Sequence, residues 1–207
     1  MPPSSSSTVS IAILAKAPVP GLAKTRLIPA IGAHAAAVLQ ERLTERAVAT
    51  ALAADVGPVT LWCAPDSTHD AFLKLALRAR ITLRPQPEGD LGARMLAAAG
   101  NGLTLVIGTD CPALTEVHLR AAAKALRDGI DVALIPAEDG GYVLIGMRSA
   151  QPALFAGMAW GTKTVLADTR ARIIEQRLVL AEQPPLWDVD TESDLARLER
   201  EIPELKL

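Results

Sequence analysis

The 207 residues are enough for one domain with a sizeable core, and a composition of 50% hydrophobic and 21% charged residues excludes a disordered chain. A net charge of −2 gives no basic footprint for nucleic acid, and no apolar run is long enough to span a membrane. Residues 1–8 are rich in proline and serine and predict a disordered leader, with a single domain over 9–207. The cysteines number only two, so we expect no disulfide framework and a reducing cytoplasm.

Apolar runs of strand length alternate along the chain with stretches of helical periodicity. Strands are expected over residues 9–15, 58–63, 81–83, 104–107, 131–136, 143–147 and near 178–180. Helices are expected over residues 33–54, 67–79 and 115–126, from a loop over 86–95 to about 99, up to about 175, and after a cap at 191. Asp66 and Ser67 mark the expected start of the second of these helices. This alternation predicts an α/β fold of the three-layer, doubly wound type, in which helices cover both faces of a mainly parallel sheet.

The segment over residues 104–112 is the one around which the other motifs are organised. Its apolar residues Leu105, Val106 and Ile107 predict a strand buried on both faces, and Pro112 ends it because proline cannot donate to the sheet ladder. Asp110 therefore stands at the carboxyl end of a central strand, the edge at which open α/β sheets bind ligands. A carboxylate fixed there suits a divalent cation. The alternative is an aspartate that forms a turn before the next helix.

Two more carboxylates occur near the end of the sequence, at Asp188 and Asp190. In an extended segment these alternate residues point to the same face. One of them facing Asp110 would complete a magnesium site together with substrate phosphates and water. The alternative is that both only precede and cap the last helix.

Three cations occupy the loop over residues 16–29, which leaves the first strand beside the expected cleft. Arg26 is suited to bidentate phosphate binding, whereas Lys16 and Lys24 act as point charges. Gly21 permits close backbone approach, and the prolines of the loop limit its freedom. The glycine spacing fits neither a Walker A loop nor a Rossmann fingerprint. An ordinary exposed basic loop is the alternative.

Two glycine-containing segments add candidate ligand contacts. Gly140 and Gly141 leave room for a ligand beside Asp139 and Tyr142, although a tight turn between two strands explains them equally well. The helix start over 89–95, which contains Gly92 and Arg94, could present backbone amides and a positive charge to an anion, or be a plain helix start.

The cysteine and histidine residues give weaker signals. Cys111 has no histidine near it in sequence, so a small buried thiol is favoured over a nucleophile. His34, His69 and His118 have no metal-ligand spacing and are interpreted as surface or helix-cap residues.

Several motifs in one order identify a family resemblance that spans the chain from about Val9 to Leu198. The chain resembles the glycosyltransferase-A-like transferase family (nucleotide-diphospho-sugar transferase superfamily) related to 2-phospholactate guanylyltransferase and to molybdenum-cofactor nucleotidyltransferases. The segments that carry it are AKAPVPGLAKTRL, GDLGARM, GTDCPALT, EDGGYVLIGM, the tryptophan and threonine at 160 and 162, and DVDTESDL. In two places the sequence departs from the family: Asp110 stands alone where many members have Asp-x-Asp, and Gly161 replaces an expected serine.

The resemblance implies a mixed sheet of about seven strands with one antiparallel strand near the Asp-Gly-Gly-Tyr segment. It implies that Asp110 ligates Mg²⁺ or Mn²⁺, that Asp188 and Asp190 are similar to the second metal-binding position, and that Lys24 and Arg26 handle phosphates.

The function expected from these observations is nucleotidyl transfer from a nucleoside triphosphate donor to a small-molecule acceptor. Lys24, Arg26 and Asp110 are the expected catalytic residues, and Asp139 is a spare base for a hydroxyl acceptor. The residues expected to bind substrate or nucleotide are Lys16, Gly21, Thr25, Gly92, Arg94, Asp139, Gly140, Gly141 and Tyr142. The alternatives are a glycosyltransferase that uses a nucleotide-sugar and a non-catalytic nucleotide-binding module. No nucleic-acid or membrane partner is expected, and the oligomeric state is left open.

Overall fold

A computed structural model describes residues 8–206, so the expected leader over 1–8 lies outside the described residues except for Thr8. Within this range the chain forms one seven-stranded sheet of order β3-β2-β1-β4-β6-β5-β7. The strands are β1 (Ser10–Lys16), β2 (Val59–Ala64), β3 (Ile81–Pro85), β4 (Thr104–Ile107), β5 (Val132–Pro136), β6 (Tyr142–Met147) and β7 (Leu180–Glu182). Only β6 runs antiparallel to its neighbours β4 and β5, so the expected mixed sheet is confirmed.

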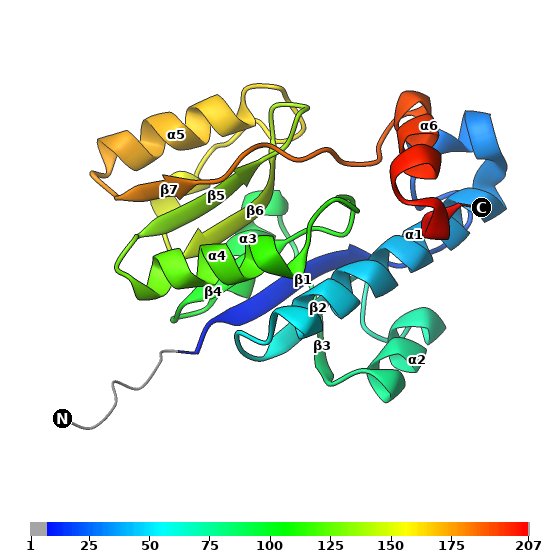
Figure 1. The fold of residues 1–207 in the computed structure, drawn as a ribbon, viewed down its shortest axis with the longest axis horizontal. Coiled ribbons are helices and arrows are strands. Elements are labelled where there is room, and N and C mark those ends of the chain that lie inside the picture. The colour runs from blue at the N-terminus through cyan, green and yellow to red at the C-terminus, as the bar shows by residue number, and fades with distance from the viewer. Residues whose placement is uncertain (1–7, 207) are drawn as a thin grey trace.

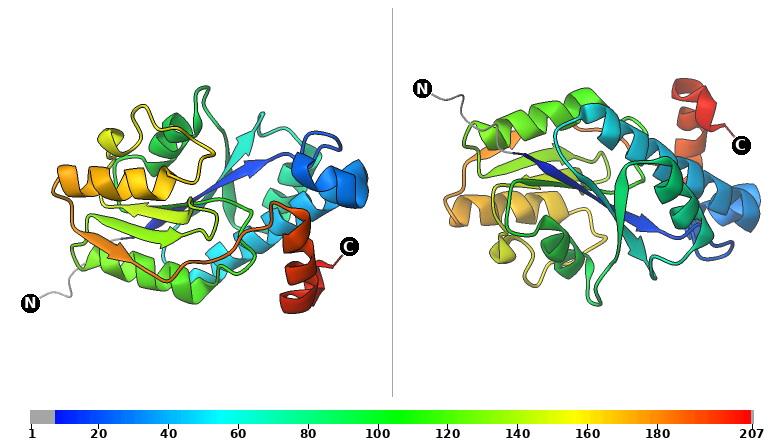
Figure 2. Two further views of the ribbon diagram at one scale, coloured as in Figure 1. Left: turned by 90° about the horizontal axis from the view of Figure 1, so that it is seen from above. Right: turned by 90° about the horizontal axis from the view of Figure 1, so that it is seen from below.

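The helices form the two outer layers of the fold (Figures 1 and 2). They are α1 (Ile28–Ala54), α2 (Asp70–Arg78), α3 (Leu91–Ala99), α4 (Glu116–Arg127), α5 (Val165–Glu175) and α6 (Glu192–Glu201), and a 3₁₀ turn, η1 (Thr25–Leu27), precedes α1. Helices α1, α2 and α4 cover one face of the sheet, and α3 and α5 cover the other. No helix among residues 8–206 is long and apolar enough to cross a membrane.

The central strand β4 is buried on both faces, as its sequence predicts. Leu105 and Ile107 pack into the core under α1 and α4, whereas Val106 points to the opposite core against α3 and α5. All four residues of β4 are buried. Because both side-chain layers are packed, the end of β4 is a rigid platform for the residues that follow.

Two helix starts differ from the sequence expectation. Helix α1 begins at Ile28 rather than 33, and its first turn is separated by a non-helical Gly32 with φ 79°. Helix α2 begins at Asp70, so the expected start at 67 is wrong. Asp66 instead closes a local turn by accepting a hydrogen bond from the Thr68 amide at 2.8 Å, and His69 caps the helix by accepting from Ala71.

The last helix brings the end of the chain back to the central strand. The Thr191–Asp194 capping box starts α6, as predicted. Leu198 then packs against Leu39 and Leu43 of α1, so α6 lies beside the N-terminal part of that helix (Figures 1 and 2). Because α6 packs there, residues 187–190 lie next to the segment that follows β4, and the Val189 amide donates a hydrogen bond to the Asp110 carbonyl.

Candidate active site

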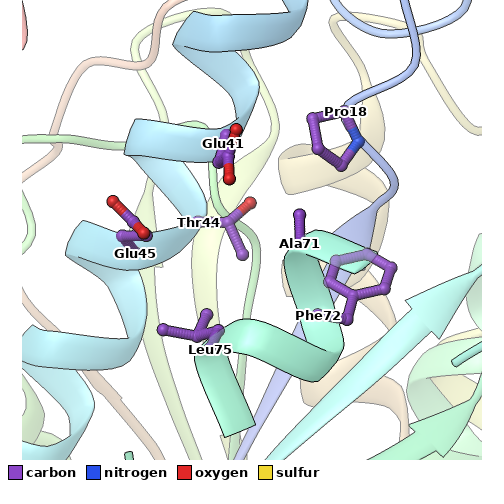
Figure 3. Close-up of a pocket in the computed structure, with 7 residues that line it drawn as sticks. All are labelled: Pro18, Glu41, Thr44, Glu45, Ala71, Phe72 and Leu75. Atoms are coloured by element: carbon purple, nitrogen blue, oxygen red, sulfur yellow. The ribbon is translucent and has the colours of Figure 1, made fainter. Parts of the chain in front are cut away.

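A cleft of about 930 Å³ opens at the carboxyl end of the central strands. Its walls come from the loop over 16–26, the start of α3, the β4–α4 connection, the β5–β6 turn and the segments 160–163 and 187–191. Open α/β sheets bind ligands at this edge. A second hollow lies between α1 and α2, bordered by Thr44 and Phe72 (Figure 3), but its volume of about 10 Å³ admits no more than one water molecule.

Lys24 and Asp110 form the central contact of the cleft. The Lys24 Nζ lies 2.5 Å from Asp110 Oδ1 and donates a hydrogen bond to the Val189 carbonyl at 2.6 Å. The Val189 amide in turn donates to the Asp110 carbonyl at 2.8 Å. The Lys24 side chain is 4% exposed and that of Asp110 is 52% exposed. Three segments that are distant in sequence therefore meet at the end of β4.

The backbone of Lys24 adopts an uncommon conformation for a residue with a side chain. Its φ of 47° and ψ of 45° lie in the left-handed region at the start of η1. This region disfavours residues with a Cβ and is retained only where the surroundings fix it. The two contacts of the ammonium group supply that restraint.

A second ion pair, between Arg26 and Asp190, joins the same loop to the C-terminal segment. Both side chains are substantially exposed, at 71% and 39%, so the pair adds little to stability. The pair does, however, fix the position of the Arg26 guanidinium, which lies beside the carboxylates of the cleft.

Asp188 is the carboxylate of the cleft whose pKa departs most clearly from its ordinary value. Burial, and then the negative charges of Asp139, Asp110 and Asp190, raise the pKa of Asp188 to about 6. A cation relieves such mutual repulsion, and carboxylate oxygens are the type of ligand that Mg²⁺ and Mn²⁺ prefer. No group of three or more His, Cys, Asp or Glu side chains between residues 8 and 206 is placed so that it could hold a metal ion. In this structure the Lys24 ammonium faces Asp110 instead.

The Asp-Gly-Gly-Tyr segment forms the tight turn between β5 and β6. Asp139 Oδ1 accepts a hydrogen bond from the Gly141 amide at 2.8 Å, and Gly140 has φ 96°. A Cβ at Gly140 would lie 2.4 Å from the Lys163 carbonyl oxygen. The glycine thus allows segment 160–163 to pack against the turn. The Tyr142 hydroxyl contacts Met95 Sδ at 3.9 Å, and burial raises the pKa of Tyr142.

The glycine at the start of α3 also serves packing. A Cβ at Gly92 would lie 2.8 Å from the Trp160 ring and 2.9 Å from the Phe155 side chain. Gly161 has φ 77°, a conformation that favours glycine over the serine expected from the family resemblance.

The structure brings most of the expected site residues to one cleft. The cleft is lined by Lys16, Lys24, Thr25, Arg26, Arg94, Asp110, Asp139, Gly141, Tyr142, Asp188 and Asp190. Three glycines, Gly21, Gly92 and Gly140, are not part of its lining. Their contribution is to the backbone paths of the segments that form the walls.

Two glutamines with positioning roles were not expected from the sequence. Gln40, buried in α1, donates to Thr109 Oγ1 at 3.0 Å and so supports the residue before Asp110. Gln86 donates to the Ala15 and Trp62 carbonyls at 3.0 and 2.8 Å, which ties together the ends of β1 and β2. Gln86 lies three residues before the GDLGARM segment, so its position near the cleft could be expected. Gln40 is separated from Thr109 by 69 positions, and no local pattern signals that contact.

The thiols are not activated. Burial raises the pKa of both Cys63 and Cys111 to about 12, so neither is a thiolate near neutral pH. His118 caps α4 by accepting from the Thr115 amide at 3.1 Å, and His69 caps α2, which accounts for two of the three histidines.

Comparison with known proteins identifies the family. Residues 47–162 match a family model described as an uncharacterized protein conserved in bacteria, DUF2064. The chain belongs to the DUF2064 family. The match covers the segment from the middle of α1 to Thr162, and so contains Arg94, Asp110 and the β5–β6 turn. No curated protein matches this DUF2064 chain.

Solved structures share the fold. A protein from Desulfovibrio desulfuricans G20, provisionally assigned as a nucleotide-diphospho-sugar transferase, has 29% identity and a TM-score of 0.83 over 95% of this chain and 89% of its own. A nucleotidyl transferase from Methanothermobacter thermautotroptrophicus has 16% identity and a TM-score of 0.65, over 95% and 98% of the two chains. Glucosyl-3-phosphoglycerate synthase from Mycobacterium tuberculosis, in complex with Mn²⁺, has 13% identity and a TM-score of 0.54, over 96% and 78%. The expected resemblance to nucleotide-diphospho-sugar transferases and nucleotidyltransferases is confirmed.

Proposed function

We propose that this DUF2064 protein is a divalent-metal-dependent nucleotidyltransferase that acts on a nucleoside triphosphate and a small acceptor. The observation that carries this proposal is the joining of a cationic loop to an acidic strand end: Lys24 contacts Asp110, and Arg26 contacts Asp190. Phosphoryl chemistry uses this pairing, because cations neutralise the phosphates while carboxylates hold a metal ion. Similarity to transferases of this fold supports the reaction class.

In the proposed reaction an acceptor oxygen attacks the α-phosphorus of the triphosphate. The bond from this phosphorus to the bridging oxygen breaks, and the electron pair leaves with pyrophosphate. Lys24 and Arg26 neutralise the departing group, and Lys16, exposed at the end of β1, holds the triphosphate. Because these cations come from one short loop, they can act on neighbouring phosphates together.

Asp110, with Asp188 or Asp190, would hold the metal ion. When bound, Mg²⁺ or Mn²⁺ supplies charge neutralisation and alignment of the phosphates. The clustered negative charge around Asp188 supports this assignment, and the structurally similar glucosyl-3-phosphoglycerate synthase was solved with Mn²⁺.

The acceptor determines whether a base is needed. A phosphate acceptor is already ionised and loses no proton on attack. A hydroxyl acceptor transfers its proton as the new bond forms, and Asp139, an exposed carboxylate that lines the cleft, is the base that we propose for this step. Its Oδ1 is held by the Gly141 amide, which fixes the orientation of the carboxylate.

Glycosyl transfer from a nucleotide-sugar is the second candidate, favoured by the 29% identity to the Desulfovibrio protein.

An activity assay separates the candidate functions. The protein is incubated with Mg²⁺ or Mn²⁺, a panel of acceptors and one donor at a time: each of the four common nucleoside triphosphates, and then UDP- and GDP-sugars. Pyrophosphate release supports nucleotidyl transfer, and nucleoside diphosphate release only from sugar donors supports glycosyl transfer. Nucleotide affinity that survives Asp110→Ala, without turnover, would indicate a non-catalytic module.

A further inference from the structure

Arg94 is a cation of the cleft wall that lacks a compensating carboxylate. It lies in the first half of α3 and is partly buried. Its one side-chain hydrogen bond within residues 8–206 runs from Nη1 to Gln86 Oε1 at 3.4 Å, and no acidic side chain in that range forms an ion pair with it. Its Nε is buried without a partner. A guanidinium whose Nε is buried without a partner, and which meets only a neutral amide, is costly unless a ligand supplies the missing charge.

Gln86 fixes the orientation of Arg94. Because the Gln86 side-chain amide donates to both Ala15 and Trp62, its oxygen is turned toward Arg94. This contact engages Nη1 and leaves the opposite edge of the guanidinium, Nε and Nη2, for another partner. That edge forms two parallel hydrogen bonds with a carboxylate or phosphate.

Trp160 supplies a second donor without a partner in the same cleft. Its Nε1 is buried and makes no hydrogen bond within the described chain. The ring packs over Gly92, two residues before Arg94, and lines the cleft. Tryptophan offers only a donor, so the group that satisfies it must be an acceptor. Two unsatisfied donors therefore line the same cleft, one from α3 and one from the segment that packs on α3, and both favour an oxyanion as ligand.

We infer that Arg94 and Trp160 form a subsite for a carboxylate or phosphate carried by the acceptor substrate, apart from its attacking oxygen. The inference rests on the proposed transferase function. The triphosphate already has the cations of the 16–29 loop, whereas Arg94 comes from a separate element. Trp160 belongs to the segment that packs on the β5–β6 turn, where Gly140 meets Lys163, and that turn carries Asp139, the proposed base for the acceptor. The acceptor is thus an acid or a phosphorylated compound.

The probes are sodium acetate and inorganic phosphate, titrated into the full chain at low ionic strength while tryptophan fluorescence is followed. Both nitrogen atoms are buried, so binding of an oxyanion to them should change the surroundings of the Trp160 ring. We expect a saturable change with at least one probe, its loss in Trp160→Phe, and at least about tenfold weaker binding in Arg94→Met. Arg84→Met is the matched control, since Arg84 stacks over Trp62 at 5.8 Å outside the cleft lining and should bind as wild type.

Two further measurements separate a ligand role from a structural one. Arg94→Met should melt at or above the wild-type temperature, because it removes an unsatisfied buried donor, and it should bind nucleoside triphosphates within about twofold of wild type. Arg94→Lys keeps the charge without the paired donors and should bind the probe with intermediate strength.

The inference is overturned if wild type binds neither probe, if Arg94→Met binds as wild type, or if nucleotide affinity falls together with probe affinity. A large loss of melting temperature in Arg94→Met would assign the side chain to structure and also overturn it. A failure of the proposed function can be told apart from a failure of this inference. The proposed function fails when no nucleotide is turned over, and that result does not change the binding of acetate or phosphate in the titration.

Discussion

The Lys24 ammonium lies 2.5 Å from Asp110 and 2.6 Å from the Val189 carbonyl, so one nitrogen joins the N-terminal loop, the central strand and the C-terminal segment. It contacts the carboxylate that we propose as a metal ligand. An ammonium group and a divalent ion at the same carboxylate repel each other, so each weakens the binding of the other. We therefore expect metal binding to weaken the contact of Lys24 with Asp110 and to free the ammonium group for phosphate.

Removing this ammonium should strengthen metal binding in the absence of nucleotide. We expect Lys24→Met to bind Mn²⁺ several-fold more tightly than wild type in calorimetry, because the competing cation is gone. With a triphosphate present, the same variant should lose the gain, since a phosphate contact is lost as well. Lys16→Met, which removes an exposed charge outside the Asp110 contact, is the control for metal binding alone. Weaker metal binding by Lys24→Met would contradict the competition.

Asp188 predicts an unusual dependence of stability on pH. Its folded pKa of about 6 lies above the ordinary value of 3.8, so the folded state holds its proton more tightly than the unfolded state. Its ionisation therefore lowers the free energy of unfolding as pH rises from about 4 to 6. Discounted for solvent screening, Asp188→Asn should stabilise the metal-free protein by about 1–2 kcal/mol at pH 7.5 and by little at pH 4.

Urea unfolding in EDTA at the two pH values measures this difference. The effect should reverse with saturating Mn²⁺, because the variant then lacks a proposed ligand. An equal effect of Asp188→Asn at pH 4 and pH 7.5 would show that its ionisation is not the cause.

Gly140 should be intolerant of a side chain. Gly140→Ala places a Cβ 2.4 Å from the Lys163 carbonyl and retains a left-handed φ, so we expect a loss of about 2–4 kcal/mol in the free energy of unfolding. Gly102→Ala is the matched control, because no atom in the described part of the chain lies within 4 Å of its Cβ and its φ is not positive. Equal stabilities of the two variants in chemical denaturation would refute this account of the turn.

The thiols should be inert in the folded protein. Because burial raises the pKa of Cys63 and Cys111 to about 12, alkylation by iodoacetamide at pH 8 should be slow until denaturant is added. Mass spectrometry of the labelled protein follows this directly. Rapid labelling of native Cys111, together with loss of turnover in Cys111→Ser, would reopen a nucleophilic role for it.

Local patterns predicted the parts of the fold that depend on local physics. The apolar run of β4 predicted that the strand is buried on both faces and that Asp110 follows its carboxyl end. The Thr191–Asp194 capping box predicted the start of α6. The start of α2 was missed because Asp66 closes a turn of its own instead of capping the helix.

The contacts that complete the cleft are long-range and have no local signature. The pairing of Lys24 with Asp110 depends on the left-handed backbone at Lys24 and on docking of the C-terminal segment, 165 positions away at Val189. Gly92 has a packing role that the sequence could not reveal, because its neighbour Trp160 arrives from a separate loop.

The most direct test of the central claim compares nucleoside triphosphate binding with Mn²⁺ and with EDTA, by calorimetry, in wild type, Asp110→Asn and Asp128→Asn. Asp128 ends α4 and pairs with Lys124 outside the cleft lining, so its variant controls for the loss of one surface charge. We predict that Mn²⁺ strengthens nucleotide binding at least about tenfold in wild type and Asp128→Asn, and not in Asp110→Asn. Equal nucleotide affinity with and without Mn²⁺ in wild type, or a metal effect that persists in Asp110→Asn, would contradict the account.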